Sequence, residues 1–171
     1  MRLNSKQTDA MRIVFMGTPH FAIPVLDALA SSETVQVCGV FTPPDKPGGR
    51  GRQVVPPPVK LRAIELGLAV HQPPTLRSDG ARALLSELRP DIIVVAAYGR
   101  FLPSPVLELP PYGCLNLHPS LLPKHRGPSP VVTTILEGDL TTGVSLMLLD
   151  EGMDTGPIIA QQVHSLTGHE T

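Results

Sequence analysis

The chain has 171 residues, of which 42% are apolar, and a formal net charge of −1. This length is enough to bury one sizeable hydrophobic core, and the near-neutral charge excludes a protein that binds nucleic acid through bulk basic character. No apolar run reaches membrane-spanning length, and residues 1–10 are polar, too short for a signal peptide and not rich in arginine. We expect residues 1–10 to be a disordered extension and Met11 to be the functional start.

Apolar runs of strand length alternate with helical patterns along the chain, which is typical of βαβ units and a mainly parallel sheet. Strands are predicted over 12–16, 35–42, 69–71, 91–97, 113–117, 143–149 and 157–163. Helices are predicted over 19–30, 57–67, 79–88 and 130–137, with Thr18 as the N-cap of the first and a Gly/Pro-rich loop over 43–55. The last two strands, joined by an acidic loop, can pair antiparallel. The pattern predicts an α/β fold.

Two cysteines, Cys38 and Cys114, fall in predicted apolar strands without ligand spacing. Buried reduced thiols are therefore favoured over a disulfide, which indicates a reducing compartment. No metal site is expected, because His118 and His125 lie seven residues apart on a turn and no cysteine or acidic cluster has chelating spacing.

Residues 113–126 are the most informative stretch, because a short apolar strand runs into Asn116, His118 and a proline-bounded turn. Strand ends in an open α/β sheet meet a crevice, and residues two apart on a strand share a face, so both side chains should point into that crevice. An amide and an imidazole side by side can polarise a carbonyl oxygen. Further on, Asp150 and Asp154 lie on a glycine-flanked loop, and either can orient or charge the histidine. Spacing alone leaves open a structural histidine and a turn-forming asparagine.

The run Asn-Leu-His-Pro-Ser-Leu-Leu-Pro over 116–123, followed by the acidic loop over 150–157, resembles the core signature of the folate-dependent formyltransferases. Residues 15–22, 41–52, 58–60 and 97–99 resemble the methionyl-tRNA formyltransferase branch, and the resemblance runs from Met11 to the last residue. It departs from the family pattern at His125 and at residues 128–130, where the family has an aromatic and small residues.

The resemblance implies a Rossmann-like three-layer αβα domain whose mainly parallel sheet has an antiparallel edge. It also implies transfer of a formyl group from 10-formyltetrahydrofolate to the amino group of the methionyl moiety of initiator Met-tRNA, in the cytoplasm, for translation initiation. No metal, membrane or protein partner is expected from it.

By the same resemblance, Asn116, His118 and Asp154 are the catalytic residues. Asn116 and protonated His118 would donate hydrogen bonds to the oxyanion of a tetrahedral intermediate. Asp154 would favour the imidazolium and help to move the proton, and it is preferred over Asp150 because it matches the family aspartate before a small-Gly-Pro turn. The residues that the resemblance assigns to the folate slot are Tyr98, Arg100, Leu102, Ser120, Leu121, Leu122, Pro123 and Asp150.

The loop over 45–52 carries Lys46, Arg50 and Arg52 among glycines. A mobile loop of this kind can approach a phosphate backbone with local positive charge alone, although an ordinary solvated loop is the alternative. The resemblance implies that it binds the acceptor end of tRNA, with Arg50 central.

Thr167 and Glu170 have the spacing of a capping box, which opens a helix, although a frayed polar terminus is the alternative. The resemblance implies a further helical segment and a carboxy-terminal β-barrel domain that helps to bind tRNA. We therefore expect residues 11–171 to be a formyltransferase amino-terminal domain that is incomplete at its carboxy end.

Several other functions remain open. A dinucleotide-binding module is disfavoured because Gly17 stands alone where a Gly-x-Gly-x-x-Gly turn is needed. Glycinamide ribonucleotide formyltransferase is expected to carry a glycine- and serine-rich phosphate cradle after the first strand, which residues 16–19 lack. Formyl-folate hydrolase, sugar-nucleotide formyltransferase and a non-catalytic truncated fragment are the remaining alternatives.

Overall fold

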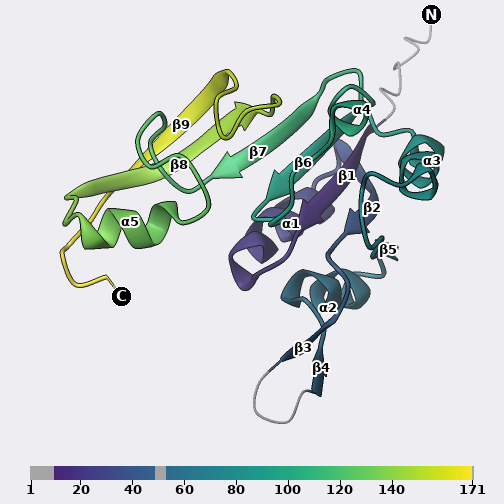
Figure 1. Ribbon diagram of the computed structural model, residues 1–171, viewed down its shortest axis with the longest axis horizontal. Helices are drawn as coiled ribbons and strands as arrows, with labels where there is room; N and C mark the ends of the chain where they lie inside the picture. The colour runs from purple at the N-terminus through teal and green to yellow at the C-terminus, as the bar shows by residue number, and fades with distance from the viewer. Residues whose placement is uncertain (1–9, 49–52, 171) are drawn as a thin grey trace, which may run out of the picture.

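The computed structural model describes residues 10–48 and 53–170. The helices and strands, in chain order, are β1 (Met11–Gly17), η1 (His20–Ala22), α1 (Ile23–Ala30), β2 (Val35–Phe41), β3 (Lys46–Gly48), β4 (Gln53–Val55), α2 (Pro58–Glu65), β5 (Val70–His71), α3 (Asp79–Leu88), β6 (Ile92–Ala96), α4 (Ser104–Leu107), β7 (Cys114–His118), α5 (Pro130–Leu136), β8 (Thr141–Leu148) and β9 (Ile158–Ser165). A seven-stranded sheet has the order β5-β2-β1-β6-β7-β8-β9, and β3 and β4 form a separate hairpin (Figure 1).

Five neighbouring strands of the sheet, from β5 to β7, run parallel, whereas β8 pairs antiparallel with β7 and β9 pairs antiparallel with β8. The carboxyl ends of the parallel strands therefore lie at one edge, where α/β proteins usually bind ligands. The predicted mainly parallel sheet with an antiparallel edge is confirmed.

The core lies on both faces of the sheet, because side chains of a strand alternate between faces. In β1, Val14 and Met16 join the cluster that contains Leu85 of α3, while Phe15 joins the cluster that contains Leu26 of α1. Helices α1 and α2 thus cover one face, and α3 and α4 cover the other, which confirms the predicted three-layer α/β fold (Figure 1).

Helix α3 has the predicted bounds because its sequence carries clear end signals. The Ser78 hydroxyl accepts a hydrogen bond from the Ala81 N–H at 3.3 Å, and Arg89 ends the helix in the left-handed conformation at φ 45°.

The prediction for the first helix was wrong at its start. Thr18 does not cap it, because the Thr18 hydroxyl donates to the Tyr98 carbonyl at 2.8 Å. A 3₁₀ turn, η1, comes first, and α1 begins only at Ile23, with Pro24 in its first turn. A tertiary contact to the loop after β6 has replaced the local cap.

The predicted loop over 43–55 was also wrong in part, because the hairpin β3–β4 forms within it. Its strands have three residues each, and a proline and a glycine in β3 are typical loop residues. Figure 1 shows the hairpin projecting away from the sheet.

Helix α5 and the neighbouring strands leave a broad apolar surface exposed, here called the α5 patch: Val131, Val132, Ile135, Leu136, Leu140 and Val163. Leu136 and Leu140 are 81% and 76% exposed. Beside them, a second cavity of about 500 Å³ lies among α5, β8 and β9. Contiguous exposed apolar surface promotes association.

We predict that the double substitution Leu136→Lys and Leu140→Lys lowers self-association of the 171-residue chain without lowering its unfolding midpoint, because both side chains are already in solvent. Sedimentation velocity and thermal unfolding measure the two quantities, and Leu61→Lys, on exposed α2 surface, is the control. A clear fall in the unfolding midpoint would show that the α5 patch is packed rather than exposed.

Both cysteines are free thiols: Cys114 is buried in β7 and Cys38 is half-buried in β2. Burial raises the pKa of Cys114 to about 12 and also raises the pKa of Cys38. Within the described residues, no helix combines the length and the apolar character that crossing a bilayer requires.

Because the thiolate is the reactive form, we predict that a thiol reagent at about pH 8 leaves Cys114 unmodified until the chain unfolds. Counting modified thiols in a Cys38→Ser variant, before and after adding guanidinium chloride, isolates this residue. Rapid modification of the native variant would contradict the buried placement of Cys114.

Candidate active site

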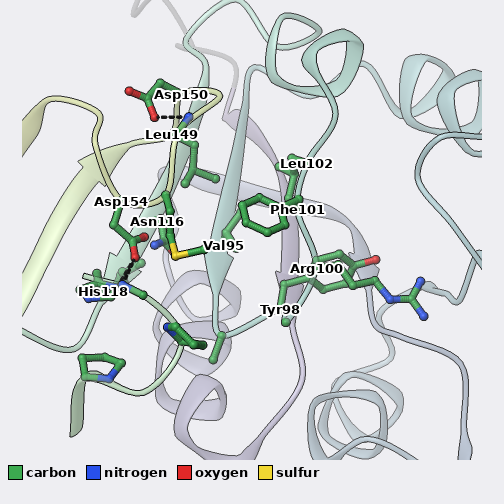
Figure 2. Close-up of a pocket in the computed structure, with 18 of the residues that line it drawn as sticks. Val95, Tyr98, Arg100, Phe101, Leu102, Asn116, His118, Leu149, Asp150 and Asp154 are labelled. Atoms are coloured by element: carbon green, nitrogen blue, oxygen red, sulfur yellow. Dashed lines mark hydrogen bonds and ion pairs between the residues drawn. The ribbon is translucent and has the colours of Figure 1, made fainter. Parts of the chain in front are cut away.

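A cavity of about 480 Å³ lies at the carboxyl edge of the parallel strands, beside β6 and β7. Its walls come from the loop after β6, from the end of β7 and from the loop between β8 and β9 (Figure 2). Asn116, His118 and Asp154 share one wall, and residues 97–102 form the wall opposite. The cavity is thus assembled from segments far apart in the sequence.

Strand β7 places Asn116 and His118 on the same face, so both reach this wall. Its register aligns Asn116 with Met147 and His118 with Ser145 of β8. Because β7 is hydrogen-bonded on both sides, it holds these side chains on a rigid element.

The His118 ring is 4% exposed and has different neighbours at its two nitrogens. Nε2 lies 2.9 Å from the carbonyl oxygen of His125. A carbonyl oxygen only accepts, so Nε2 carries the hydrogen in this contact. Nδ1 lies 3.6 Å from Oδ2 of Asp154, beyond a good hydrogen bond. Nδ1 is therefore the nitrogen that can exchange a proton in the cavity.

The loop over 149–157 brings Asp154 to the histidine. The loop starts beside the amino end of β7, where the Leu149 N–H donates to the Cys114 carbonyl at 2.8 Å, and it runs back toward His118. The Gly127 N–H donates to Oδ2 of Asp154 at 2.8 Å, which fixes the carboxylate. Asp154 is thus held by one fixed donor while it faces Nδ1.

Asp150 also lines the cavity, but its carboxylate shapes its own loop. It accepts from the Gly152 N–H at 3.0 Å and from the Thr155 hydroxyl at 2.7 Å. The Ser104 hydroxyl of α4 donates to Glu151 at 2.6 Å, which ties the same loop to the helix. Of the two aspartates, Asp154 is the one beside His118.

Tyr98, Arg100 and Leu102 line the opposite wall. The Arg100 guanidinium donates to the carbonyls of Pro73 and Pro74 at 3.2 and 2.8 Å, and Figure 2 shows it pointing away from the wall that carries His118 and Asp154. Tyr98 is 1% exposed, and burial raises the pKa of its phenol, which the nearby Arg100 charge opposes. This wall therefore offers backbone and apolar surface rather than a charge.

The structure does not bring the other predicted folate residues to the cavity: Ser120, Leu121, Leu122 and Pro123 are absent from its lining. The Ser120 hydroxyl donates to the Lys124 carbonyl at 2.7 Å, and the Leu122 N–H donates to the buried Ser145 hydroxyl at 3.0 Å. The Ser120 hydroxyl is thus used within the turn, and the Leu122 N–H is used in a contact with β8. Because these residues directly follow Pro119, which lines the cavity, their assignment to the folate slot stays a prediction.

Strained backbone gathers at the site. Of the four non-glycine residues described with positive φ, Ala97 at 47° lines the cavity, as does Asp154 at 52°, and His125 at 56° supplies the carbonyl that meets His118. Such conformations persist only where surrounding structure enforces them, and they concentrate at functional sites.

Some residues at the site were not singled out individually from the sequence, although Phe101 and Met153 lie within the segments over 98–102 and 149–154 that the resemblance assigns to the folate slot. Phe101, 67% exposed, and Met153, 49% exposed, add apolar surface at the cavity, and Gly127 supplies the donor to Asp154. The glycine in a His-Arg-Gly-Pro run was a visible signal for a special backbone position. No sequence signal indicated the role of the His125 carbonyl, because every residue has the same backbone carbonyl.

Of the predicted tRNA-binding residues, Lys46 is exposed at the start of β3, and Arg50 and Arg52 lie outside the described residues. The base of the hairpin is anchored, because the Asp45 carboxylate accepts from Lys60 at 2.6 Å and from Gln72 at 2.8 Å. The hydrogen bond from Lys60 is the main cause that lowers the pKa of Asp45. Since β3 follows β2, the hairpin leaves the same edge of the sheet as the cavity.

Two curated relatives of this chain share one name. Methionyl-tRNA formyltransferase of Dehalococcoides mccartyi (strain CBDB1) is 52% identical over 161 residues, which cover 94% of this chain and 51% of that protein. The protein of the same name from Roseiflexus sp. (strain RS-1) is 55% identical over 152 residues, covering 89% of this chain and 47% of its own length. The chain spans about half the length of these curated relatives.

Among solved structures, phosphoribosylglycinamide formyltransferase from Bacillus halodurans matches with a TM-score of 0.73 and 28% identity over 94% of this chain and 82% of that chain. A formyltetrahydrofolate deformylase from Pseudomonas syringae pv. tomato shares the fold, with a TM-score of 0.73 and 21% identity over 96% of this chain and 54% of that chain. The family model described as formyl transferase matches residues 11–171. The chain therefore belongs to the formyl transferase family.

Proposed function

We propose that this chain carries the catalytic site for transfer of a formyl group from 10-formyltetrahydrofolate to the amino group of the methionyl moiety of initiator Met-tRNA. The observation that carries the proposal is the shared wall of Asn116, His118 and Asp154, with Nδ1 of His118 3.6 Å from Asp154. The names of the relatives at 52% and 55% identity support this acceptor. The reaction serves translation initiation, and we place it in the cytoplasm.

The reaction needs a site that stabilises negative charge on oxygen. The amine nitrogen of the acceptor attacks the formyl carbon, which produces a tetrahedral intermediate with an oxyanion. The bond from that carbon to N10 of the folate then breaks. The attacking amine loses one proton, and N10 gains one. No oxidation or reduction takes place, so a hydrogen-bond donor and a proton carrier are sufficient.

Asn116 and His118 supply these groups in our proposal. The Asn116 amide donates an N–H to the developing oxyanion, as an oxyanion hole requires. His118 donates from Nδ1, because Nε2 is held by the His125 carbonyl. Asp154, fixed by Gly127, stabilises the imidazolium while the proton passes from the amine to N10.

The cavity suits a flat donor. Its opposite wall presents the backbone of residues 97–102 together with Phe101 and Leu102, which offer hydrogen-bonding groups and apolar surface. A pterin ring needs both. We assign the folate to this wall, to the turn over 120–123 and to the loop over 149–154.

The acceptor distinguishes this proposal from the other formyltransferase reactions. After β1, the Thr18 hydroxyl is bound to the Tyr98 carbonyl, the Thr18 carbonyl accepts from the Val59 N–H at 3.3 Å, and Pro19 has no N–H. This turn is occupied by internal contacts, which favours a different acceptor from a small ribonucleotide phosphate. We propose that the anchored hairpin, with Lys46 and with Arg50 and Arg52 outside the described residues, contacts tRNA phosphates instead.

We also propose that residues 11–171 are the amino-terminal domain of a two-domain enzyme, because the relatives are about twice as long as this chain. Glu170 accepts from the Thr167 N–H at 2.7 Å and from its hydroxyl at 2.8 Å, as one half of a capping box would. The carboxy-terminal half of the Dehalococcoides relative can therefore be joined to this chain as a test protein.

We predict that this chimera transfers a formyl group to Met-tRNA and that His118→Ala or Asp154→Ala lowers the single-turnover rate by roughly a hundredfold or more, the range for losing an oxyanion donor or a proton carrier. Glycinamide ribonucleotide and water are offered as competing acceptors. Asp79→Ala, on exposed α3, is the control and should keep the parental rate.

A near-parental rate in either active-site variant would remove that residue from the mechanism. Formyl transfer to glycinamide ribonucleotide, or release of free formate at a comparable rate, would overturn the assignment of Met-tRNA as the acceptor.

We predict that Arg50→Ala in the chimera weakens use of Met-tRNA and lowers the slope of the salt dependence by about one, as expected when one phosphate contact is removed, while folate affinity stays unchanged. Steady-state rates over a range of salt concentrations and a folate titration measure the two effects. Arg77→Ala, on a different loop, is the matched control. An equal loss of folate affinity would show that the hairpin does not act on tRNA alone.

A further inference from the structure

The turn between β7 and α5 carries charged groups that the proposed reaction does not use. Nε2 of His125 lies 2.7 Å from Oδ2 of Asp139 and 3.9 Å from Oε2 of Glu137. Nζ of Lys124 lies 2.5 Å from Oδ1 of Asp139. The side chains of His125 and Asp139 are only 7% and 14% exposed, whereas those of Lys124 and Glu137 are each 55% exposed. Asp139 is therefore the group that holds this turn.

In the part of the chain that the structure describes, His125, Glu137 and Asp139 also form the one set of three side chains close enough to share a metal ion. The internal pairing argues against that use. Each oxygen of Asp139 already has a nitrogen partner, one from Lys124 and one from His125. The lysine ammonium already supplies a positive charge to Asp139, so these groups bind one another.

The interaction that matters for the active site is made by the His125 backbone. Its carbonyl accepts the hydrogen bond from Nε2 of His118 at 2.9 Å. His125 has a φ of 56°, in the left-handed region that a residue with a side chain adopts only when neighbouring structure enforces it. The 2.7 Å contact with Asp139 is such a constraint, since it ties the side chain of the strained residue to the segment after α5.

We propose that His125 and Asp139 are positioning residues for His118. Asp139 anchors the His125 side chain, and the anchored His125 backbone holds its carbonyl against Nε2 of His118. That hydrogen bond keeps the hydrogen on Nε2 and leaves Nδ1 free to face Asp154. The consequence for formyl transfer rests on the proposed function, whereas the state of the His118 ring is a property of the 171-residue chain itself.

The groups around the turn support the proposal that Asp139 acts through His125 on His118. Lys124 and Glu137 are exposed, so they are weaker partners than the buried pair. The Ser120 hydroxyl holds the Lys124 carbonyl at 2.7 Å, which fixes the residue before His125 but not the His125 side chain. On the other side of the His118 ring, Asp154 would attract a hydrogen to Nδ1 if the His125 carbonyl moved away.

The test is nitrogen-15 NMR of the His118 ring in the 171-residue chain, at a pH high enough to keep the ring neutral. We expect a slowly exchanging hydrogen on Nε2 and an unprotonated Nδ1. In Asp139→Ala and in His125→Asn, that hydrogen should exchange at least about tenfold faster, because a turn without its anchor opens locally more often. Asparagine tolerates the left-handed backbone but is too short to replace the histidine side chain at Asp139.

Two conservative variants and one control complete the design. His125→Gln can still donate a side-chain N–H to Asp139, and Asp139→Asn keeps the shape of the carboxylate, so exchange should stay within about threefold of the parent for a retained neutral hydrogen bond. Asp79→Asn, on exposed α3, is the matched control. Thermal unfolding of each variant identifies any that do not fold, and the ring state of the parent chain tests the proposal without a substitution.

A hydrogen on Nδ1 in the neutral parent ring would overturn the proposal, as would parental exchange at Nε2 in folded Asp139→Ala and His125→Asn. The expected exchange rates, together with a chimera that transfers no formyl group, would overturn the proposed function and leave the positioning of His118 intact.

Discussion

The hydrogen bond from Nε2 of His118 to the His125 carbonyl is the interaction on which the rest of the site depends. This bond gives Nε2 a structural role, whereas Nδ1 faces Asp154 and serves proton transfer in the proposed mechanism. A buried N–H without an acceptor costs about 1–3 kcal/mol, more than a typical net gain from one hydrogen bond, so loss of the carbonyl would favour a turned ring. A turned ring would no longer present Nδ1 to Asp154, and the proposed mechanism would lose its proton carrier.

The sheet and the loops share the task of holding these groups. Strand β7 fixes Asn116 and His118 because it is paired on both sides, while Asp154 and the His125 carbonyl come from loops with left-handed backbone. The loops are held by specific donors and acceptors, Gly127 for Asp154 and Asp139 for His125. Strain at Asp154 and His125 is thus tolerated because each of these two residues has an anchor of its own.

Periodicity made most of the fold predictable, because it reports burial directly. The first strand and the helix over 79–88 depend on neighbouring residues in the sequence, and both were confirmed. The start of α1 and the hairpin β3–β4 were missed, since the first depends on a hydrogen bond from Thr18 to the distant Tyr98 carbonyl and the second consists of very short strands. Side chains were easier to predict than backbone roles, which is why the His125 carbonyl was not foreseen.

The same distinction separates the two halves of the motif over 116–123. Asn116 and His118 are in a regular strand, where spacing fixes direction, so both line the cavity. After Pro119 the chain leaves the strand, and the direction of each side chain depends on the hydrogen-bond partners of the turn. The Ser145 hydroxyl accepts a hydrogen bond from the Leu122 N–H, and the Gln161 side chain donates one to the Leu122 carbonyl at 2.9 Å. The turn therefore packs toward β8 and β9. The second half of the motif is therefore fixed by contacts with distant residues, which spacing along the sequence does not predict.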